Sequence, residues 1–331
     1  MTLSQVLEVM NLLDGWVTGE QVADYVRGYG VQVSVEAVAS RTGRTEFLSM
    51  LVPGTAGRSS GGSARTTGIV GRLGGVGARP TVTGMVSDAD GAVAALACAA
   101  KLGRMRDRGD SLRGDVRIST HICPDAPTEP HDPVPFMGSP VPIATMNEHE
   151  VHQQMDVVMS VDTTKGNRLV SHKGIALTMP VVEGWIAPLS DGLLDILQVV
   201  TGSAPVVMPL SMYDITPYGN GLPHVNSIVQ PAVATGAPVV GVAVTSAVAV
   251  PGCASGASHP VDVALAATLC VEVAKAMAEP TFDVLDRDAL ERARELYGSM
   301  AALQGQGLGS AGNLDFAGTS AAAGGYSRKG E

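Results

Sequence analysis

The chain has 331 residues, of which 45% are hydrophobic, only 4% are aromatic and 16% are charged. This length allows one large α/β domain or two small ones, with a core built mainly from aliphatic side chains. The formal net charge of −10, without a dense stripe of lysine and arginine, argues against nucleic acid or an anionic membrane as a partner.

Residues 2–28 predict two short amphipathic helices, the second of which ends at a glycine. The opening stretch lacks the basic region of a signal peptide, and we expect a cytoplasmic protein. We therefore divide the chain into a helical segment, 1–30, that could serve oligomerisation, a single α/β domain, 31–302, and a flexible Gly/Ala/Ser-rich tail, 303–331. A homo-oligomer is expected.

The segment 54–80 is rich in glycine and carries Arg65, Arg72 and Arg79. These arginines could hold an anion. However, the segment has neither the Gly-Lys-Ser/Thr of a P-loop nor a GxGxxG turn that opens a helix. We interpret it as tight turns and strand crossings.

From residue 81 onward, strand patterns alternate with helix patterns. Strands are predicted within 81–86, 114–122, 156–164, 204–214 and 237–250, and helices within 92–105, 147–155, 190–201, 259–278 and 287–300. This alternation predicts an α/β fold with a doubly wound, mostly parallel sheet flanked by helices. In such sheets ligands bind beyond the carboxyl ends of the strands.

One long stretch, 215–261, contains no Asp, Glu, Lys or Arg. Prolines and glycines interrupt it every few residues, so no apolar run approaches the roughly 18–20 residues that span a bilayer. Buried parallel strands explain it better, and we expect no membrane span.

Potential metal ligands follow four of the predicted strands. They are Asp88 and Asp90, His121, Asp162, and His259. If the strands are parallel, these side chains converge at one edge and could bind one or two divalent ions. The alternative is that each acid caps the helix that follows it.

Four segments resemble, in order and spacing, those of the di-zinc exopeptidases, the aminopeptidase and carboxypeptidase superfamily. They are GMVSDADGAVAALACAAKL, GDVRISTHICPD, VVMSVDTT and APVVGVAVTSAVAVPGCASGASHPVDVALAA, within about residues 80–280. The resemblance implies a phosphorylase/hydrolase-like architecture and a zinc site, with Asp88 as the bridging ligand and Asp162 and His259 as further ligands. The HxD motif of that superfamily is missing, and His121 stands roughly where it has a glutamate pair.

A closer resemblance runs along almost the whole chain. The segments GRLGGVGARP, SDADGAVAALA, STHICPDAPTEPHDPVPFMGSPV, DTTKGN, DITPYGNGLPHVNSI and PGCASGASH are similar to those of an uncharacterised bacterial and archaeal family, a domain of unknown function. This second resemblance implies no particular chemistry.

The leading hypothesis is a metal-dependent hydrolase of an amide or peptide bond in a small molecule or short peptide, with zinc or a similar ion bound by Asp88, His121, Asp162 and His259. Asp125 would be the general base. One alternative is a non-catalytic binding or assembly protein on the same scaffold. Another is a thiol hydrolase or amino-acid racemase that uses Cys253 or Cys123, each on a loop near histidine.

The loop at 213–226 follows an apolar strand and is rich in glycine and polar residues. Loops at the carboxyl ends of strands often contact substrate. Five of its side chains could bind the polar groups of a substrate: Asp214, Tyr218, Asn220, His224 and Asn226.

Overall fold

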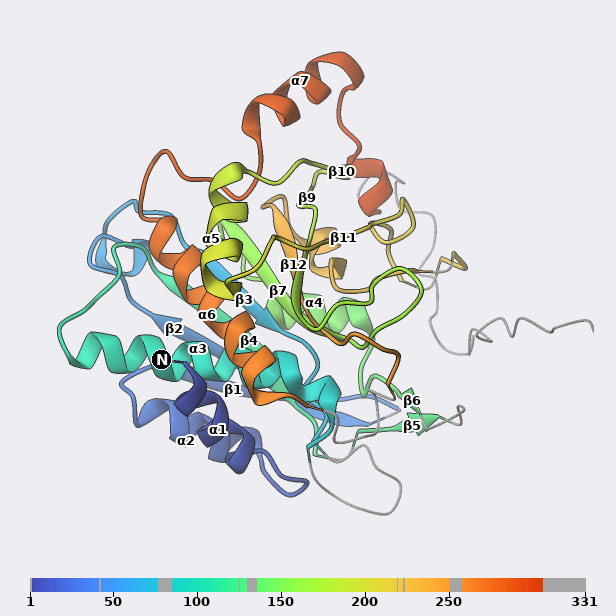
Figure 1. Ribbon diagram of the computed structural model, residues 1–331. Coiled ribbons are helices and arrows are strands. Elements are labelled where there is room, and N and C mark those ends of the chain that lie inside the picture. The colour runs from blue at the N-terminus through green and yellow to red at the C-terminus, as the bar shows by residue number, and fades with distance from the viewer. Residues whose placement is uncertain are drawn as a thin grey trace, which may run out of the picture.

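The computed structural model describes residues 2–41, 43–76, 85–124, 126–129, 136–218, 220–222, 224–250 and 258–305. Within these residues the chain forms a mixed ten-stranded sheet flanked by helices (Figure 1). The strand order is β1-β2-β4-β3-β7-β12-β8-β11, and β9 pairs with both β10 and β12. The predicted α/β fold is confirmed.

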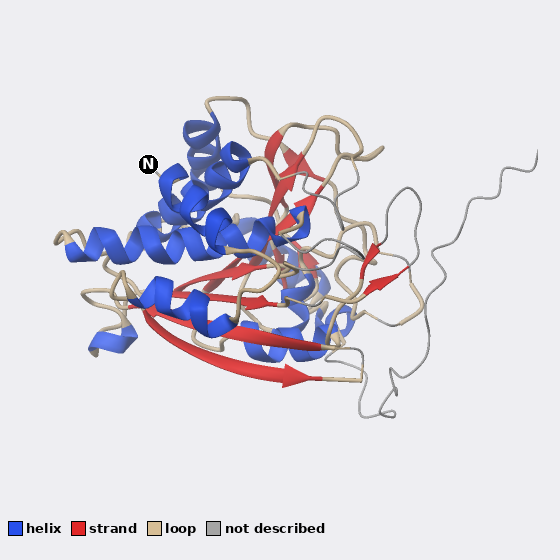
Figure 2. Ribbon diagram, turned by 90° about the horizontal axis from the view of Figure 1, so that it is seen from below, coloured by secondary structure: helices blue, strands red, loops and turns tan. Residues whose placement is uncertain are grey.

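The bounds of the strands are β1 Gln32–Ala39, β2 Arg44–Val52, β3 Thr67–Gly71, β4 Val116–Ile122, β7 Val157–Thr164, β8 Gly174–Thr178, β9 Val181–Val182, β10 Trp185–Ile186, β11 Val207–Met208 and β12 Val239–Thr245. A separate small pair, β5 (Thr128–Glu129) and β6 (Phe136–Met137), lies apart from the main sheet (Figure 2).

The α-helices are α1 Leu3–Leu12, α2 Gly19–Arg27, α3 Asp90–Asp107, α4 Ile143–Glu150, α5 Asp191–Thr201, α6 Pro260–Ala276 and α7 Arg287–Tyr297. Four short 3₁₀ helices accompany them: η1 Arg58–Ser60, η2 Ser87–Ala89, η3 Gln230–Ala234 and η4 Ala301–Gln304. Helices α3 and α6 lie side by side over the sheet, and α7 stands at one end of the molecule (Figure 1).

The sheet is mixed. The central strands β4, β3, β7 and β12 run parallel, and β11 pairs in parallel with β8 at one margin, whereas the pairs β1–β2, β2–β4 and β8–β12 are antiparallel. The strands β1 and β2 form an antiparallel hairpin at one margin. Strand β3 lies within the glycine-rich segment 54–80, where the sequence had indicated only turns and strand crossings.

One face of the sheet is covered by α1, α2, α3, α5 and α6, which share a single hydrophobic cluster with the strands. The N-terminal helices belong to this cluster through buried side chains such as Val6, Val9 and Val22, so they pack on the α/β core. Their predicted role in oligomerisation stays a prediction.

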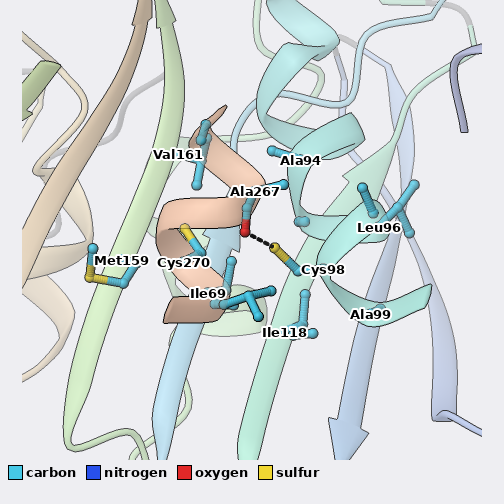
Figure 3. Packing of buried hydrophobic residues seen from close by; sticks show 14 of the residues in the cluster. Ile69, Ala94, Leu96, Cys98, Ala99, Ile118, Met159, Val161, Ala267 and Cys270 are labelled. Carbon is cyan, nitrogen blue, oxygen red and sulfur yellow. Dashed lines mark hydrogen bonds between the residues drawn. The ribbon is translucent and has the colours of Figure 1, made fainter. Parts of the chain in front are cut away.

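The core under α3 and α6 is built from small side chains. Figure 3 shows Cys98 on α3 and Cys270 on α6 between the two helices, above Ile69 and Ile118 of the sheet. The thiol of Cys98 donates to the carbonyl oxygen of Ala267 at 3.3 Å. Small residues allow the two helices to approach closely, which explains why few aromatic residues are needed.

The opposite face is covered by α4, η3 and the segment that leads into η3. A smaller hydrophobic cluster, which includes Val158, Ile215, Val229 and Ala243, fills part of it. In the described part of the chain, none of the helices combines the length and the apolar character that crossing a membrane requires.

Candidate functional site at the carboxyl end of the parallel strands

Three polar residues lie at one level across three neighbouring parallel strands. Val70 of β3 pairs with Ser119 of β4 and with Ser160 of β7. Two residues further on, Arg72, His121 and Asp162 therefore share a row. The chain continues the pairing there, since the Arg72 N–H donates to the Val161 carbonyl at 2.8 Å. The strands thus bring together groups that are far apart in sequence.

A buried ion network connects this row to α4. Arg72 Nε lies 2.6 Å from one carboxylate oxygen of Glu150, and His121 Nδ1 lies 2.6 Å from the other. Arg72 also donates to the side-chain oxygen of Asn147 at 2.5 Å. Burial raises the pKa of Glu150, but the charge of Arg72 and the hydrogen bonds from His121 and Arg72 outweigh burial, and the net pKa is lowered.

Both ring nitrogens of His121 have partners. The N–H of Gly74 points at Nε2 from 3.3 Å, so this nitrogen accepts, and Nδ1 carries the proton that is donated to Glu150. The ring also contacts Phe47 edge-on. A metal ion would have to displace one of these partners, so His121 acts as a positioned structural donor.

Two carboxyl groups, those of Asp88 and Asp162, lie near each other beside this network. Asp88 belongs to η2, which is held in place by two hydrogen bonds: Leu73 N–H to the Asp88 carbonyl at 2.9 Å and Thr163 Oγ1 to the Ser87 carbonyl at 2.7 Å. Burial, and next the negative charge of Asp88, raise the pKa of Asp162 from its ordinary value of 3.8 to about 8. Asp162 is therefore protonated at neutral pH.

A glycine lets α3 begin next to this pair. A Cβ atom on Gly91 would lie 2.0 Å from the carbonyl oxygen of Arg72 and 2.4 Å from that of Val161. Only a residue without a side chain permits this contact. The Asp-Gly at the start of α3 thus brings η2 against the ends of β3 and β7.

A second buried ion pair lies at the N-terminus of α3. Lys165, directly after β7, places Nζ 2.9 Å from Asp90 Oδ2, and both side chains are almost completely buried. Burial raises the pKa of Asp90, and the Lys165 charge opposes that effect. His259, exposed at the N-cap of α6, acts electrostatically on the same carboxylate.

The structure does not bring the four predicted metal ligands together. Asp88 lies near Asp162, and His121 is hydrogen-bonded to Glu150. His259 instead acts electrostatically on Asp90. Among the described residues no group of three or more His, Cys, Asp or Glu side chains could hold a metal ion. The side chains of the predicted site therefore do not fit a metal ion as a set.

The predicted substrate-binding loop divides into two parts. Asp214 accepts from Ser211 and from the N–H of Asn226, and Asn220 bonds within the loop to Thr216. The side chain of Asn226 donates to the Pro209 carbonyl at 3.0 Å. Asp214, Asn220 and Asn226 thus fix the shape of the loop.

The other two residues of that prediction form a ring pair. Tyr218 stacks on His224 with ring centroids 4.4 Å apart. Burial, and after it the charge of Asp162, raise the pKa of the Tyr218 hydroxyl, and Arg72 lowers it. Tyr218 therefore lies near the row of Arg72 and Asp162. His224 Nε2 is buried and has no hydrogen-bond partner among the described residues.

The predicted thiol sites have different outcomes. Cys123 is 1% exposed, and its thiol donates to the carbonyl of Arg44 at 3.3 Å, which is the environment of a structural cysteine. Cys253 and Asp125 lie outside the described residues. The proposed general base and the second thiol thus stay predictions.

Two important residues were not singled out from the sequence. Glu150 sits in a polar stretch, NEHEVHQ, and nothing in its spacing shows that it is the buried acid of the network. Lys165 could have been noticed, because a lysine that directly follows a buried strand at the ligand edge is unusual.

The family of the chain follows from a comparison with known families. The model of DUF1177, described as "Protein of unknown function", matches residues 36–307. The chain belongs to this family. The resemblance to a domain-of-unknown-function family is confirmed, and no curated protein matches the chain.

Among solved structures, the chain is similar to the cytosol aminopeptidase from Coxiella burnetii, determined at 1.8 Å resolution. The identity is 12% and the TM-score is 0.44. The match covers 77% of this chain and 65% of the length of the aminopeptidase. A similarity of this size says nothing about the activity of the DUF1177 chain.

Proposed function

We propose that this protein is a hydrolase of an amide or peptide bond in a small substrate, with Asp88 and Asp162 as its acid–base pair. The observation that carries the proposal is the placement of two neighbouring carboxyl groups, one of which retains its proton at neutral pH, at the carboxyl end of the parallel strands. Pairs of carboxyl groups with different protonation states are typical of acid–base catalysis.

In this mechanism the two carboxyl groups have complementary roles. The charged carboxylate of Asp88 takes a proton from a water molecule, whose oxygen forms a bond to the carbonyl carbon. Protonated Asp162 donates its proton towards the substrate, and the carbon–nitrogen bond breaks with the proton on the departing nitrogen. The proton that Asp88 took from water then passes to Asp162, which restores the starting protonation states of both groups.

The neighbouring groups would stabilise the reacting atoms. Arg72 is positively charged and acts on both Asp162 and Tyr218. A positive charge held rigidly beside the carbonyl oxygen would stabilise its developing negative charge. Glu150 and Asn147 fix the guanidinium from behind, so Arg72 would need no rearrangement during the reaction. Among the described residues the predicted metal has no assembled set of ligands, and no step here uses one.

A panel of dipeptides, cyclic dipeptides and simple amides tests the proposal, with product formation followed by mass spectrometry. We expect turnover that falls by about 10²-fold or more in Asp162→Asn and in Asp88→Asn. The matched control is Asp195→Asn, since Asp195 is exposed on α5. Turnover that is unchanged in both site variants would contradict the assignment.

The dependence on pH gives a second measure. Activity that needs the Asp162 proton is present below the pKa of about 8 and declines as the pH rises through it. If the activity of Asp162→Asn declines with the same midpoint, the pH dependence belongs to another group.

The second candidate is binding without catalysis. It is favoured by the dispersal of the predicted metal ligands among separate hydrogen-bonded partners. Binding of a panel compound without turnover, weakened in Arg72→Lys, would support it over hydrolysis.

A further inference from the structure

The ion pair of Lys165 and Asp90 lies at the same edge of the sheet as the Asp88–Asp162 pair. Lys165 follows Asp162 by three residues, and Asp90 follows Asp88 by two. The side chains of Lys165 and Asp90 are 4% and 0% exposed, and their charged atoms are 2.9 Å apart. A lysine so deeply buried is rare unless an acid compensates its charge.

The ammonium group supplies a positive charge where a divalent cation would otherwise compensate the acids. A metal ion at Asp90 would have to displace Lys165 Nζ from Oδ2, or bind beside a fixed positive charge that repels it. The second fixed cation, Arg72, acts on Asp162. The negative charges of the carboxyl groups at this edge are thus compensated by the positively charged side chains of Lys165 and Arg72.

Two buried oxygen atoms lie next to the pair. They are the second oxygen of Asp90, Oδ1, and the hydroxyl of Ser258, which helps to stabilise the charged form of Asp90. Both are oxygen atoms of the kind that bind hard divalent cations. The environment of Lys165 therefore contains potential oxygen ligands together with an ammonium group that already holds one of them.

We propose that the ammonium group of Lys165 takes the place of a metal ion at Asp90, so that this edge of the sheet works without a bound divalent cation. The inference deepens the proposed function, on which it rests for the identity of the site, by stating its cofactor requirement. It also predicts that an acid in place of Lys165 creates a divalent-cation site.

The experiment measures metal binding rather than turnover, so it can fail while the proposed hydrolase activity holds, and the reverse. Purified full-length protein is dialysed against a chelator and then titrated with Mn²⁺ and Zn²⁺. Bound metal is measured by equilibrium dialysis, and the shift in Tm is followed against metal concentration. The variants are Lys165→Glu, Lys165→Met and, as a surface control, Lys173→Glu, since Lys173 is exposed.

We expect Lys165→Glu to bind Mn²⁺ or Zn²⁺ at least about tenfold more tightly than the wild type, with a Tm that rises as metal is added. Adding Asp90→Asn to that variant should abolish the gain. Lys165→Met and Lys173→Glu should show no gain, which separates the loss of the ammonium group from the gain of a ligand.

Two results would overturn the proposal. One is a wild-type protein that binds a stoichiometric divalent ion which Asp90→Asn or Asp162→Asn removes. The other is a folded Lys165→Glu variant without any gain in affinity. If Lys165→Glu does not fold in the absence of metal, failure of Mn²⁺ and Zn²⁺ to restore its cooperative thermal transition counts against the proposal equally.

Discussion

The two faces of the central sheet are made by the same strands, yet they differ in chemistry. Ile69 and Ile118 point to the face covered by α3 and α6, where the cluster around Cys98 and Cys270 is apolar throughout (Figure 3). Residues of the opposite parity, such as His121, point to the face under α4. Alternation along each strand thus separates a packing face from a polar face.

The difference shows how each face obtains its stability. On the helical face, burial of apolar surface stabilises the fold at about 25 cal/mol per Å². On the polar face, buried charges are tolerated only where they have partners, and breaking one partnership leaves another charge uncompensated. The first face is expected to tolerate small changes locally, and the second to respond as a network.

The largest effect is expected at Glu150, which joins Arg72 and His121. Its replacement in Glu150→Ala leaves a buried guanidinium without its carboxylate and should lower the free energy of unfolding by about 3–5 kcal/mol. Urea denaturation monitored by circular dichroism measures this loss. The matched control is Glu148→Ala on the same helix, where the residue is exposed. Equal losses in the two variants would show that the polar face is no network.

The helical face is tested by Leu96→Ala. Leu96 is fully buried in the middle of α3, and its truncation should cost about 2–5 kcal/mol, depending on how far the cavity closes. This loss should not change with pH between 5 and 9, because no titrating group is involved. Val199→Ala, at an exposed position of α5, is the control in the same urea experiment. A pH-dependent loss in Leu96→Ala would mean that the two faces are coupled.

A stabilising change is expected at Asp162. The folded protein keeps the Asp162 proton up to about pH 8, whereas the unfolded chain releases it near the ordinary value of 3.8. Between these values the folded state binds more protons, so its stability falls as the pH rises. Asp162→Asn removes this loss and should raise stability by the order of 1–3 kcal/mol at pH 8, and by little at pH 4.

Thermal unfolding at a series of pH values measures the difference between Asp162→Asn and the wild type. Asp195→Asn serves again as an exposed control. A gain that is largest at pH 4 would contradict the raised pKa, and with it the assignment of Asp162 as the proton donor.

The sequence predicts the helical face better than the polar face, for physical reasons. Apolar periodicity indicates helices such as α5, α6 and α7, and their observed bounds agree to within a few residues with the prediction. The helix predicted at 147–155 instead spans Ile143–Glu150, since its polar sequence gives no clear start. The strand predicted at 204–214 shrinks to Val207–Met208.

The site was predictable only as a set of positions. That Asp88, His121 and Asp162 follow strands, or end them, could be read from local patterns. What each carboxyl or ring contacts depends on register and on α4, which local patterns do not contain. Glu150 is bonded to both Arg72 and His121, and this separates His121 from the other predicted ligands.

The smallest effect is expected at the thiol pair of the helical face. Cys98 hydrogen-bonds through its thiol, and its contact with Cys270, followed by burial, raises its pKa well above the ordinary range. Cys98→Ala should lower the free energy of unfolding by only about 1 kcal/mol, because one small group is lost. An equal loss of unfolding free energy in Cys98→Ser would show that packing, rather than the apolar character of the side chain, determines stability at this position.

Thiol labelling gives the sharper readout at this pair. In a Cys123→Ala/Cys253→Ala background, only Cys98 and Cys270 can react with a thiol reagent. A buried, protonated thiol reacts only after the helices separate, so labelling should follow the rate of global unfolding and stop in its absence. Adding Glu150→Ala should then accelerate labelling, although Glu150 lies on the other face, because the sheet connects both. Labelling that is fast in the folded protein would place the weak point of the fold between α3 and α6, and the polar network would then not control its stability.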